Sequence, residues 1–179
     1  MRSKARDIAA SAVFAVLTSI GAWISIPLPI TPVPITLQVF FVLLSGVVLG
    51  GRLGALSQII YVLLGLVGLP VFAGGASGPG VLVGPTGGYL VGFVLSAYVT
   101  ERIVGARSSS GFRWMILAAL SGLCPIYLVG EIWLWAWLRS SPTALLVAGI
   151  LPFLPGDITK AVAAAYVASR TQIKEIVRR

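Results

Sequence analysis

Long apolar stretches dominate the 179-residue sequence and leave few polar positions between them. Hydrophobic residues make up 58% of the chain and charged residues only 10%, whereas soluble domains carry about 25% charged residues. A helix that spans a membrane needs roughly 20 apolar residues, so the chain has room for about six spans with short connections. We therefore expect residues 1–179 to form a single transmembrane domain in the lipid bilayer.

Proline, glycine and charged residues mark the ends of the predicted spans. A cluster of prolines at positions 27–34 ends the first span, and Gly50 to Arg52 separate the second from the third. A Gly/Pro-rich loop occupies residues 70–85, and residues 139–153 link the last two spans through a short apolar piece. The predicted spans, all helical, are residues 8–26, 37–50, 53–69, 86–104, 114–138 and 155–169.

The basic residues are distributed unevenly across this topology. Eleven of the 13 Lys and Arg residues fall on the side that holds both termini, Arg139 alone falls on the other side, and Lys160 lies inside the last span. Because basic residues concentrate in cytoplasmic loops, we expect cytoplasmic termini and a multi-pass protein of the cytoplasmic membrane. The net charge of +8 is spread over span ends rather than one face, so we expect no nucleic-acid binding.

Small residues recur at helical spacing in three places. In lipid, such stripes let helix backbones approach closely, and internal packing is the expected use of two of them. For the stripe on the first span, docking to another membrane subunit stays open beside internal packing. The stripes are Gly84, Gly88, Gly92 and Ser96; Gly46, Gly50 and Gly54; and, on the first span, Ser11, Ala15, Thr18 and Ala22.

Three ionisable residues, Glu131, Asp157 and Lys160, fall at membrane depth away from the cytoplasmic side. Asp157 and Lys160 stand three apart on one helical face, and the first turn of a helix favours a carboxylate. Charges at this depth usually face a cavity and pair. We expect the two side chains to bind a polar solute, with an ion pair that has no ligand as the alternative.

Glu131 is harder to assign because it lies in a tryptophan-rich segment. Trp135 and Trp137 are typical of a membrane interface, whereas Trp133 could form a pocket wall. For Glu131 three hypotheses stay open: a protonated side chain, a partner of Lys160, or a contact to the ligand.

Catalysis is not expected from this sequence. The chain has no histidine, and no G-x-x-x-x-G-K-[ST] motif of an ATPase occurs. An intramembrane enzyme generally needs several acids, histidines or a metal, so we expect no enzyme and no cofactor. A scaffolding membrane subunit is a further alternative.

Four segments read PVPITLQ at residues 32–38, GLPVFAGG at 68–75, GPTGGYLVGF at 84–93 and LPFLPGDITK at 151–160. Together they resemble the BioY family, the biotin-specific substrate-binding (S) component of energy-coupling-factor (ECF) vitamin transporters. The resemblance covers essentially the whole chain. It implies an all-α, six-helix membrane bundle that binds and takes up biotin through a pocket near the outer face, covered by the first, third and fifth connections.

The same resemblance implies roles for individual residues. The family's P-G-D-x-x-K motif places Asp157 and Lys160 at biotin, and G-P-T-G-G-Y places Tyr89 there. Docking on a membrane coupling protein driven by two ATPases would use Ser11 and Ala15 of the first helix. The same architecture with another small vitamin is the nearest alternative. The predicted substrate-binding residues are Asp157, Lys160, Tyr89, Gln38, Gly75, Phe72, Thr86, Glu131 and Trp133.

Overall fold

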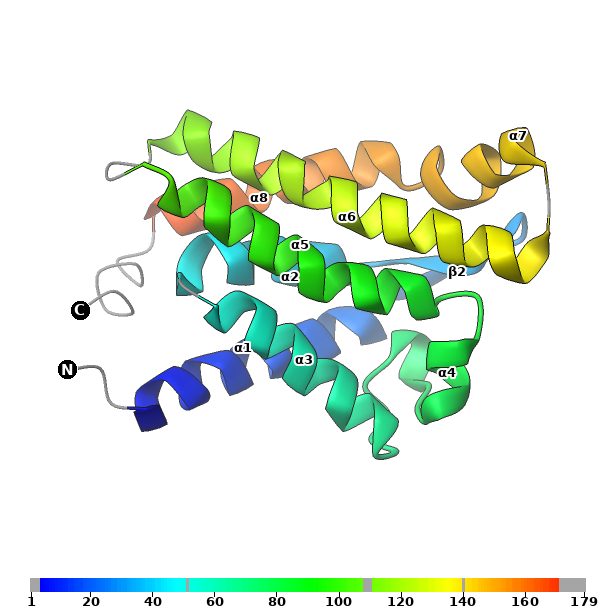
Figure 1. The fold of residues 1–179 in the computed structure, drawn as a ribbon, viewed down its shortest axis with the longest axis horizontal. Helices are drawn as coiled ribbons and strands as arrows, with labels where there is room; N and C mark the ends of the chain where they lie inside the picture. Colours follow the sequence, from blue (N-terminus) through cyan, green and yellow to red (C-terminus); the bar gives the residue numbers. More distant parts are fainter. Residues whose placement is uncertain (1–3, 51, 108–110, 140, 171–179) are drawn as a thin grey trace.

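Six helices of 12 to 27 residues form a bundle in the computed structural model, which describes residues 4–50, 52–107, 111–139 and 141–170. Each helix overlaps one of the six predicted spans, and the mostly helical fold agrees with the prediction. The helices run side by side with their ends at two opposite faces of the molecule (Figure 1). Their bounds are α1 (Lys4–Trp23), α2 (Gln38–Leu49), α3 (Leu53–Leu66), α5 (Gly87–Gly105), α6 (Phe112–Leu138) and α8 (Leu154–Arg170).

The short helix α2 lies at the centre of the bundle. It packs against α1, α3, α5, α6 and α8, and ten of its 12 residues are buried. A helix that is apolar on all sides is expected only where every face meets protein or lipid. The run from Val39 to Leu49, apolar except for Ser45, therefore explains this central position.

Glycines bring α5 and α6 into close contact. A Cβ atom at Gly92 would lie 2.9 Å from the Cα atom of Ile126, and one at Gly88 would lie 2.7 Å from the carbonyl oxygen of Val129. Real side chains do not tolerate such distances, so only glycine permits this approach. Gly88 and Gly92 of the predicted stripe are thus used for packing within the chain.

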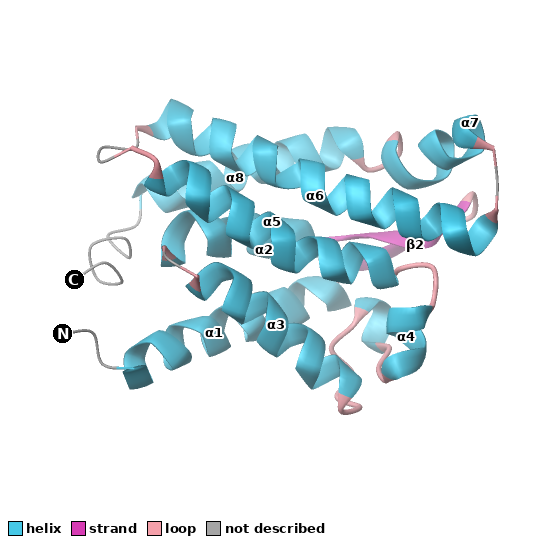
Figure 2. Cartoon of the chain, viewed as in Figure 1, coloured by secondary structure: helices cyan, strands magenta, loops and turns pink. Residues whose placement is uncertain are grey.

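The α1–α2 connection (residues 24–37) forms a β-hairpin that we did not predict. Strand β1 (Ser25–Leu28) pairs antiparallel with β2 (Thr31–Thr36), with Ser25 opposite Thr36. It is the one sheet in the described part of the chain (Figure 2). Helix α1 ends before the prolines of this connection, earlier than predicted. Each strand of the hairpin has only one neighbouring strand, so it tolerates prolines, which lack a backbone N–H group.

The two other connections near this end of the bundle contain short helices. The α3–α5 connection (residues 67–86) holds the turn η1 (Ala73–Gly75) and α4 (Pro79–Val83). Four glycines in it, at positions 68, 74, 75 and 78, adopt positive φ angles that other residues rarely take. The α6–α8 connection (residues 139–153) holds α7 (Pro142–Leu145) and a wide π-helical turn, η2 (Leu146–Ile150).

By length and composition, α1 and α6 are each able to cross a membrane. Residues 142–150 and α8 are bent by 43° at their junction, and they add a third crossing if they are taken as one span. Helices α2 and α3 are apolar but shorter than α1 and α6. The start of α1 and the end of α8 lie at the same end of the bundle (Figure 1). Four of the basic residues used for the predicted orientation, Arg2, Lys174, Arg178 and Arg179, lie outside the described residues.

Candidate functional site

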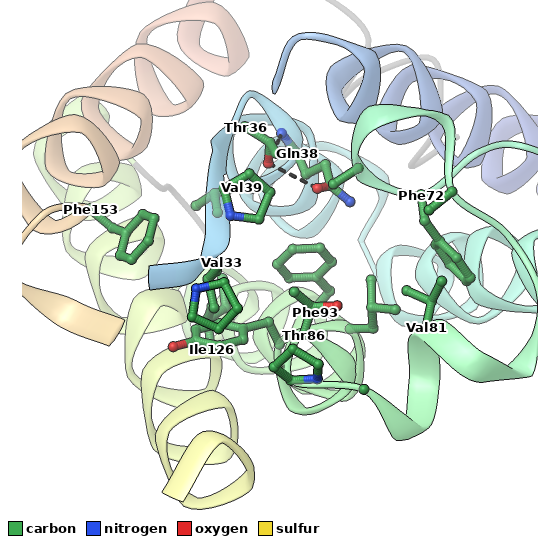
Figure 3. Close-up of a pocket in the computed structure, with 18 of the residues that line it drawn as sticks. Val33, Thr36, Gln38, Val39, Phe72, Val81, Thr86, Phe93, Ile126 and Phe153 are labelled. Carbon is green, nitrogen blue, oxygen red and sulfur yellow. Dashed lines mark hydrogen bonds between the residues drawn. The ribbon is translucent and has the colours of Figure 1, made fainter. Parts of the chain in front are cut away.

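A cavity of about 390 Å³ opens at the end of the bundle that carries the hairpin. Strand β2, the α3–α5 connection and helices α2, α5, α6 and α8 all contribute to its wall. Apolar and aromatic side chains surround most of the space (Figure 3). These include Val33, Val39, Phe72, Val81, Leu90, Phe93, Ile126 and Phe153.

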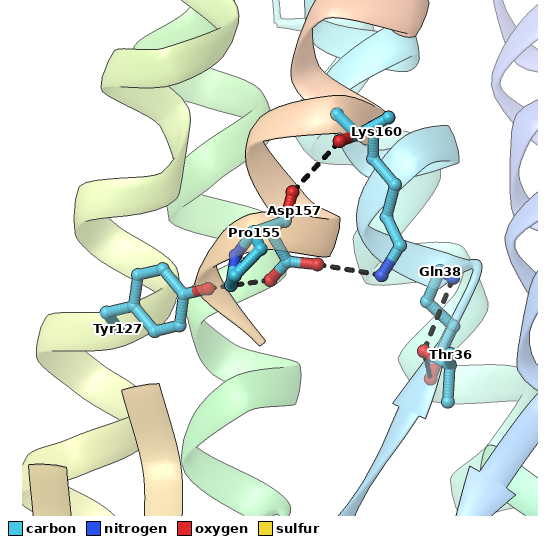
Figure 4. Close-up of polar contacts among 7 residues, drawn as sticks. Thr36, Gln38, Tyr127, Pro155, Asp157 and Lys160 are labelled. Atoms are coloured by element: carbon cyan, nitrogen blue, oxygen red, sulfur yellow. Dashed lines mark hydrogen bonds and ion pairs between the residues drawn. The ribbon is translucent and has the colours of Figure 1, made fainter. Parts of the chain in front are cut away.

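A charged pair lies in the wall formed by the first turns of α8. The ammonium nitrogen of Lys160 lies 2.7 Å from Oδ1 of Asp157, and the hydroxyl of Tyr127 donates a 2.8 Å hydrogen bond to Oδ2 (Figure 4). The two charged side chains are only 14% and 5% exposed. The carboxylate sits in the first helical turn, where the free backbone N–H groups favour negative charge. The site thus presents one cation and one anion side by side to a mostly apolar space.

A second polar group is formed by Gln38 at the start of α2. Its amide nitrogen donates a 2.6 Å hydrogen bond to the hydroxyl of Tyr61, and its amide oxygen accepts one from Thr36 at 2.9 Å. The Lys160 side chain extends toward this end of α2 (Figure 4). Gln38 is therefore fixed in orientation, with its partners supplied by α3 and β2.

Phe72 closes the cavity from the α3–α5 connection. Its ring packs edge-on against Tyr61, with 5.6 Å between ring centroids, and occupies the space that the missing side chain of Gly65 leaves. Phe72 is almost completely buried. This contact anchors the α3–α5 connection to α3. The glycines on either side of Phe72 in that connection have unusual backbone conformations.

Six of the nine predicted substrate-binding residues line this cavity. They come from four parts of the chain, α2, the α3–α5 connection, α5 and α8, so the fold brings together residues that are far apart in sequence. Their role in binding stays a prediction. The six are Gln38, Phe72, Thr86, Tyr89, Asp157 and Lys160.

Gly75, Glu131 and Trp133 do not line this cavity, and their role in binding also stays a prediction. Gly75 lies near the ring of Trp23 instead. Glu131 lines a separate cavity of about 350 Å³ between α6 and the α6–α8 connection and accepts a hydrogen bond from Tyr89. Trp133 donates a hydrogen bond from its indole nitrogen to the carbonyl oxygen of Gly84. The predicted depth of Glu131 in the membrane did not reveal which way its side chain points.

Ser11 and Ala15 do not form an exposed docking stripe. Both are fully buried, α1 packs against α3, and the hydroxyl of Ser11 donates to the carbonyl oxygen of Leu53. Packing within the chain, one of the two uses that we left open, accounts for this stripe. Its burial argues against the predicted docking role of these two residues.

Tyr127 and Thr36 are polar residues of the wall that our sequence reasoning missed. Tyr127 stands four residues before Glu131 on α6 and therefore nearly on the same helical face. That spacing was a signal that a tyrosine lies near Glu131, the only acidic residue of α6. Thr36 lies two residues before Gln38 in the PVPITLQ segment, so the sequence offered a signal for it as well. Among the described residues, no group of three or more His, Cys, Asp or Glu side chains that could hold a metal ion gathers.

The sequence matches known proteins along nearly its whole length. The model of the BioY family matches residues 1–178. The chain is 45% identical over 173 residues to the biotin transporter BioY of Thermotoga maritima, covering 97% of this chain and 99% of that protein. It is 43% identical over 169 residues to a probable biotin transporter BioY of Pyrococcus horikoshii, covering 94% and 98%. These relatives are described as transporters rather than as enzymes.

A solved structure supports the fold independently. It is a crystal structure of the S-component for biotin from an ECF-type ABC transporter, with a TM-score of 0.84 and 24% sequence identity. The match covers 100% of this chain and 96% of that chain. The chain therefore has the same overall fold as that S-component.

Proposed function

Because the chain belongs to the BioY family, we propose that it binds biotin with high affinity and is the substrate-specificity subunit of an ATP-driven uptake transporter. The observation that carries this proposal is the cavity with one Asp–Lys pair in a wall that is otherwise largely apolar. Biotin has a ureido group that donates and accepts hydrogen bonds, an apolar thioether ring and chain, and a carboxylate. A volume of about 390 Å³ falls within the range of small-molecule sites.

We further propose that the ureido end of biotin lies against Asp157 and Lys160. A ureido group presents an N–H donor beside a carbonyl acceptor, which matches a carboxylate beside an ammonium group 2.7 Å away. A biotin carboxylate at the same place would gain from Lys160 and be repelled by Asp157. The proposed contacts from Gln38, Tyr89, Thr86 and Phe72 rest on their positions in the wall.

The binding of biotin to purified protein, measured by calorimetry or tryptophan fluorescence, tests the function. We expect saturable binding and a higher melting temperature with biotin than without it, because a ligand of the folded state stabilises that state. Binding of another vitamin, with no thermal shift in biotin, would overturn the assignment. Two unrelated vitamins serve as controls: thiamine, which is similar to biotin in size, and riboflavin, which is larger.

The orientation of the ligand is tested with biotin methyl ester, which differs from biotin only at the carboxylate. If Lys160 contacts the ureido end, the substitution Lys160→Ala weakens the binding of both ligands by the same factor. If the effect of Lys160→Ala disappears with the ester, Lys160 binds the carboxylate and the proposed orientation is wrong.

For the transporter as a whole, we propose six spans in the cytoplasmic membrane with both termini in the cytoplasm. Exposed arginines lie at helix ends and connections on the same side of the bundle as the start of α1, which agrees with this orientation. They are Arg52, Arg102, Arg107, Arg113 and Arg170. A membrane coupling protein and two ATPases would supply the energy for uptake. The exposed face of α1 carries Ala5 and Ala9 at a four-residue spacing, and we propose this face as the contact to the coupling protein.

A further inference from the structure

Tyr89 occupies a slot that two glycines keep open. Its ring lies so close to Gly130 of α6 that a Cβ atom there would be 2.5 Å from two ring carbons. Its hydroxyl lies where a Cβ atom at Gly149 of η2 would be 2.7 Å away. Tyr89 is only 7% exposed and lines the main cavity. Three elements, α5, α6 and η2, thus determine where this one side chain stands.

The hydroxyl of Tyr89 has two acceptors, and both lie outside the main cavity. It donates to Oε1 of Glu131 at 3.0 Å and also approaches the carbonyl oxygen of Gly149 at 3.3 Å. Neither Glu131 nor Gly149 lines the cavity in which the Tyr89 ring lies. A hydroxyl has a single hydrogen, so the two acceptors share it, and the carboxyl group is the closer one.

The wide turn η2 makes the second acceptor available. In it the N–H of Leu151 bonds to the carbonyl oxygen of Leu146 at 2.9 Å, five residues back. Such π-helical turns are rare and occur frequently at functional sites. Here the turn brings the backbone at Gly149 against both Tyr89 and Glu131.

We propose, building on the function proposed above, that Glu131 is a positioning residue for ligand binding: it holds the Tyr89 ring at the cavity wall and joins that wall to η2. Glu131 reaches the ligand only through Tyr89. This role explains an acid at membrane depth without making it a ligand contact or a partner of Lys160. It also makes the α6–α8 connection sensitive to the position of Tyr89, although Phe153 is the only described residue of that connection that lines the cavity.

A double-mutant cycle separates this role from a direct or purely structural one. Biotin affinity is measured for wild type, Glu131→Leu, Tyr89→Phe and the double variant, with Glu131→Gln as the conservative change. Glu131→Leu is expected to weaken binding about three- to tenfold, the equivalent of one net hydrogen bond. Glu131→Gln keeps an acceptor and should stay within about twofold of wild type. In the Tyr89→Phe background, Glu131→Leu should cause no further loss.

The control is Leu128→Ala, which alters the same side cavity without changing the contact between Glu131 and Tyr89. Equal effects of Glu131→Leu with and without the Tyr89 hydroxyl would overturn the proposal, as would an affinity of Glu131→Gln as low as that of Glu131→Leu. Melting temperatures of the four proteins of the cycle, without biotin, give a second readout. Additive shifts there would show that the two residues do not act as a unit. Failure of wild type to bind biotin would instead remove the proposed function.

Discussion

The hydroxyl of Tyr127 donates to Oδ2 of Asp157 at 2.8 Å, while Oδ1 of the same carboxylate lies 2.7 Å from Lys160. The carboxylate is thus held from both sides before any ligand enters. Rotation of Asp157 would break one of these contacts, so its orientation toward the cavity is set in advance. Such preorganisation lowers the entropy that ligand binding has to overcome.

The substitution Lys160→Ala should weaken biotin binding at least tenfold, about 1.4 kcal/mol. It removes the donor that faces the cavity and leaves Asp157 buried without its countercharge. Calorimetry on purified protein measures the change. The control is Lys4→Ala, an exposed lysine at the start of α1, and equal affinities for wild type and Lys160→Ala would exclude Lys160 from the site.

The substitution Tyr127→Phe should lower the free energy of unfolding by about 1.5 kcal/mol, because a hydrogen bond to a buried charged group is lost. Unfolding in mixed micelles with increasing denaturing detergent measures it. Tyr166→Phe is the matched control, since Tyr166 is exposed and packs edge-on against Phe112 through its ring. A loss as large in the control would mean that the hydroxyl of Tyr127 adds nothing.

The substitution Gly88→Ala should lower the melting temperature markedly. The added Cβ atom would overlap the Cβ atom of Trp133 and force α5 and α6 apart, and overpacking typically costs about 1–3 kcal/mol. Gly111→Ala adds the same atom in open space and should change the melting temperature little. Similar melting curves for both variants would contradict the close packing of α5 on α6.

Two tryptophans hold the two ends of the α3–α5 connection. Trp23 donates to the carbonyl oxygen of Pro70 at 3.0 Å, and Trp133 to that of Gly84 at 2.9 Å. Trp23→Phe and Trp133→Phe should each raise the rate of biotin dissociation about three- to tenfold, because each removes one net hydrogen bond. A chase of labelled biotin gives the rate. Trp137→Phe, at an exposed position on α6, is the control, and three equal rates would rule out this anchoring.

The two faces of α1 should respond differently to added bulk. Ala9→Leu, on the exposed face, is expected to reduce biotin uptake in membranes that contain the energising subunits, while binding to the purified protein stays unchanged. Ala15→Leu, on the buried face, should instead destabilise the fold and lower both. Unchanged uptake by Ala9→Leu would argue against this face as the contact to the coupling protein.

The helices were predictable because the length of an apolar run and the residues that interrupt it are local properties. The hairpin was not, because prolines at positions 27–34 signal only that a helix ends. Whether the chain then forms a strand depends on pairing such as Ser25 with Thr36, which no single residue reveals. The alternation of prolines with Val33 and Ile35 was compatible with a strand, but equally with an irregular loop.

The residues of the candidate site likewise fall into those that the sequence could predict and those that depend on how the helices pack. Asp157 and Lys160 were predictable because three residues within one helix fix their relative position. The contact of Asp157 with Tyr127 spans 30 residues of sequence and depends on how α6 and α8 pack. For Glu131 the sequence indicates depth in the membrane, but the rotation of α6 about its axis decides that its carboxyl group meets Tyr89 rather than Lys160.

The shortness of α2 has a consequence for the size of solute that the protein accommodates. Its 12 residues measure about 18 Å, against roughly 30 Å for the hydrocarbon core of a bilayer. The chain before its first residue is the extended strand β2. Gln38, Thr36 and Val33 border the cavity there. The empty space thus stands where further turns of a central helix would otherwise run. The residue at which α2 begins therefore contributes to the size of solute that fits, together with the side chains that line the wall.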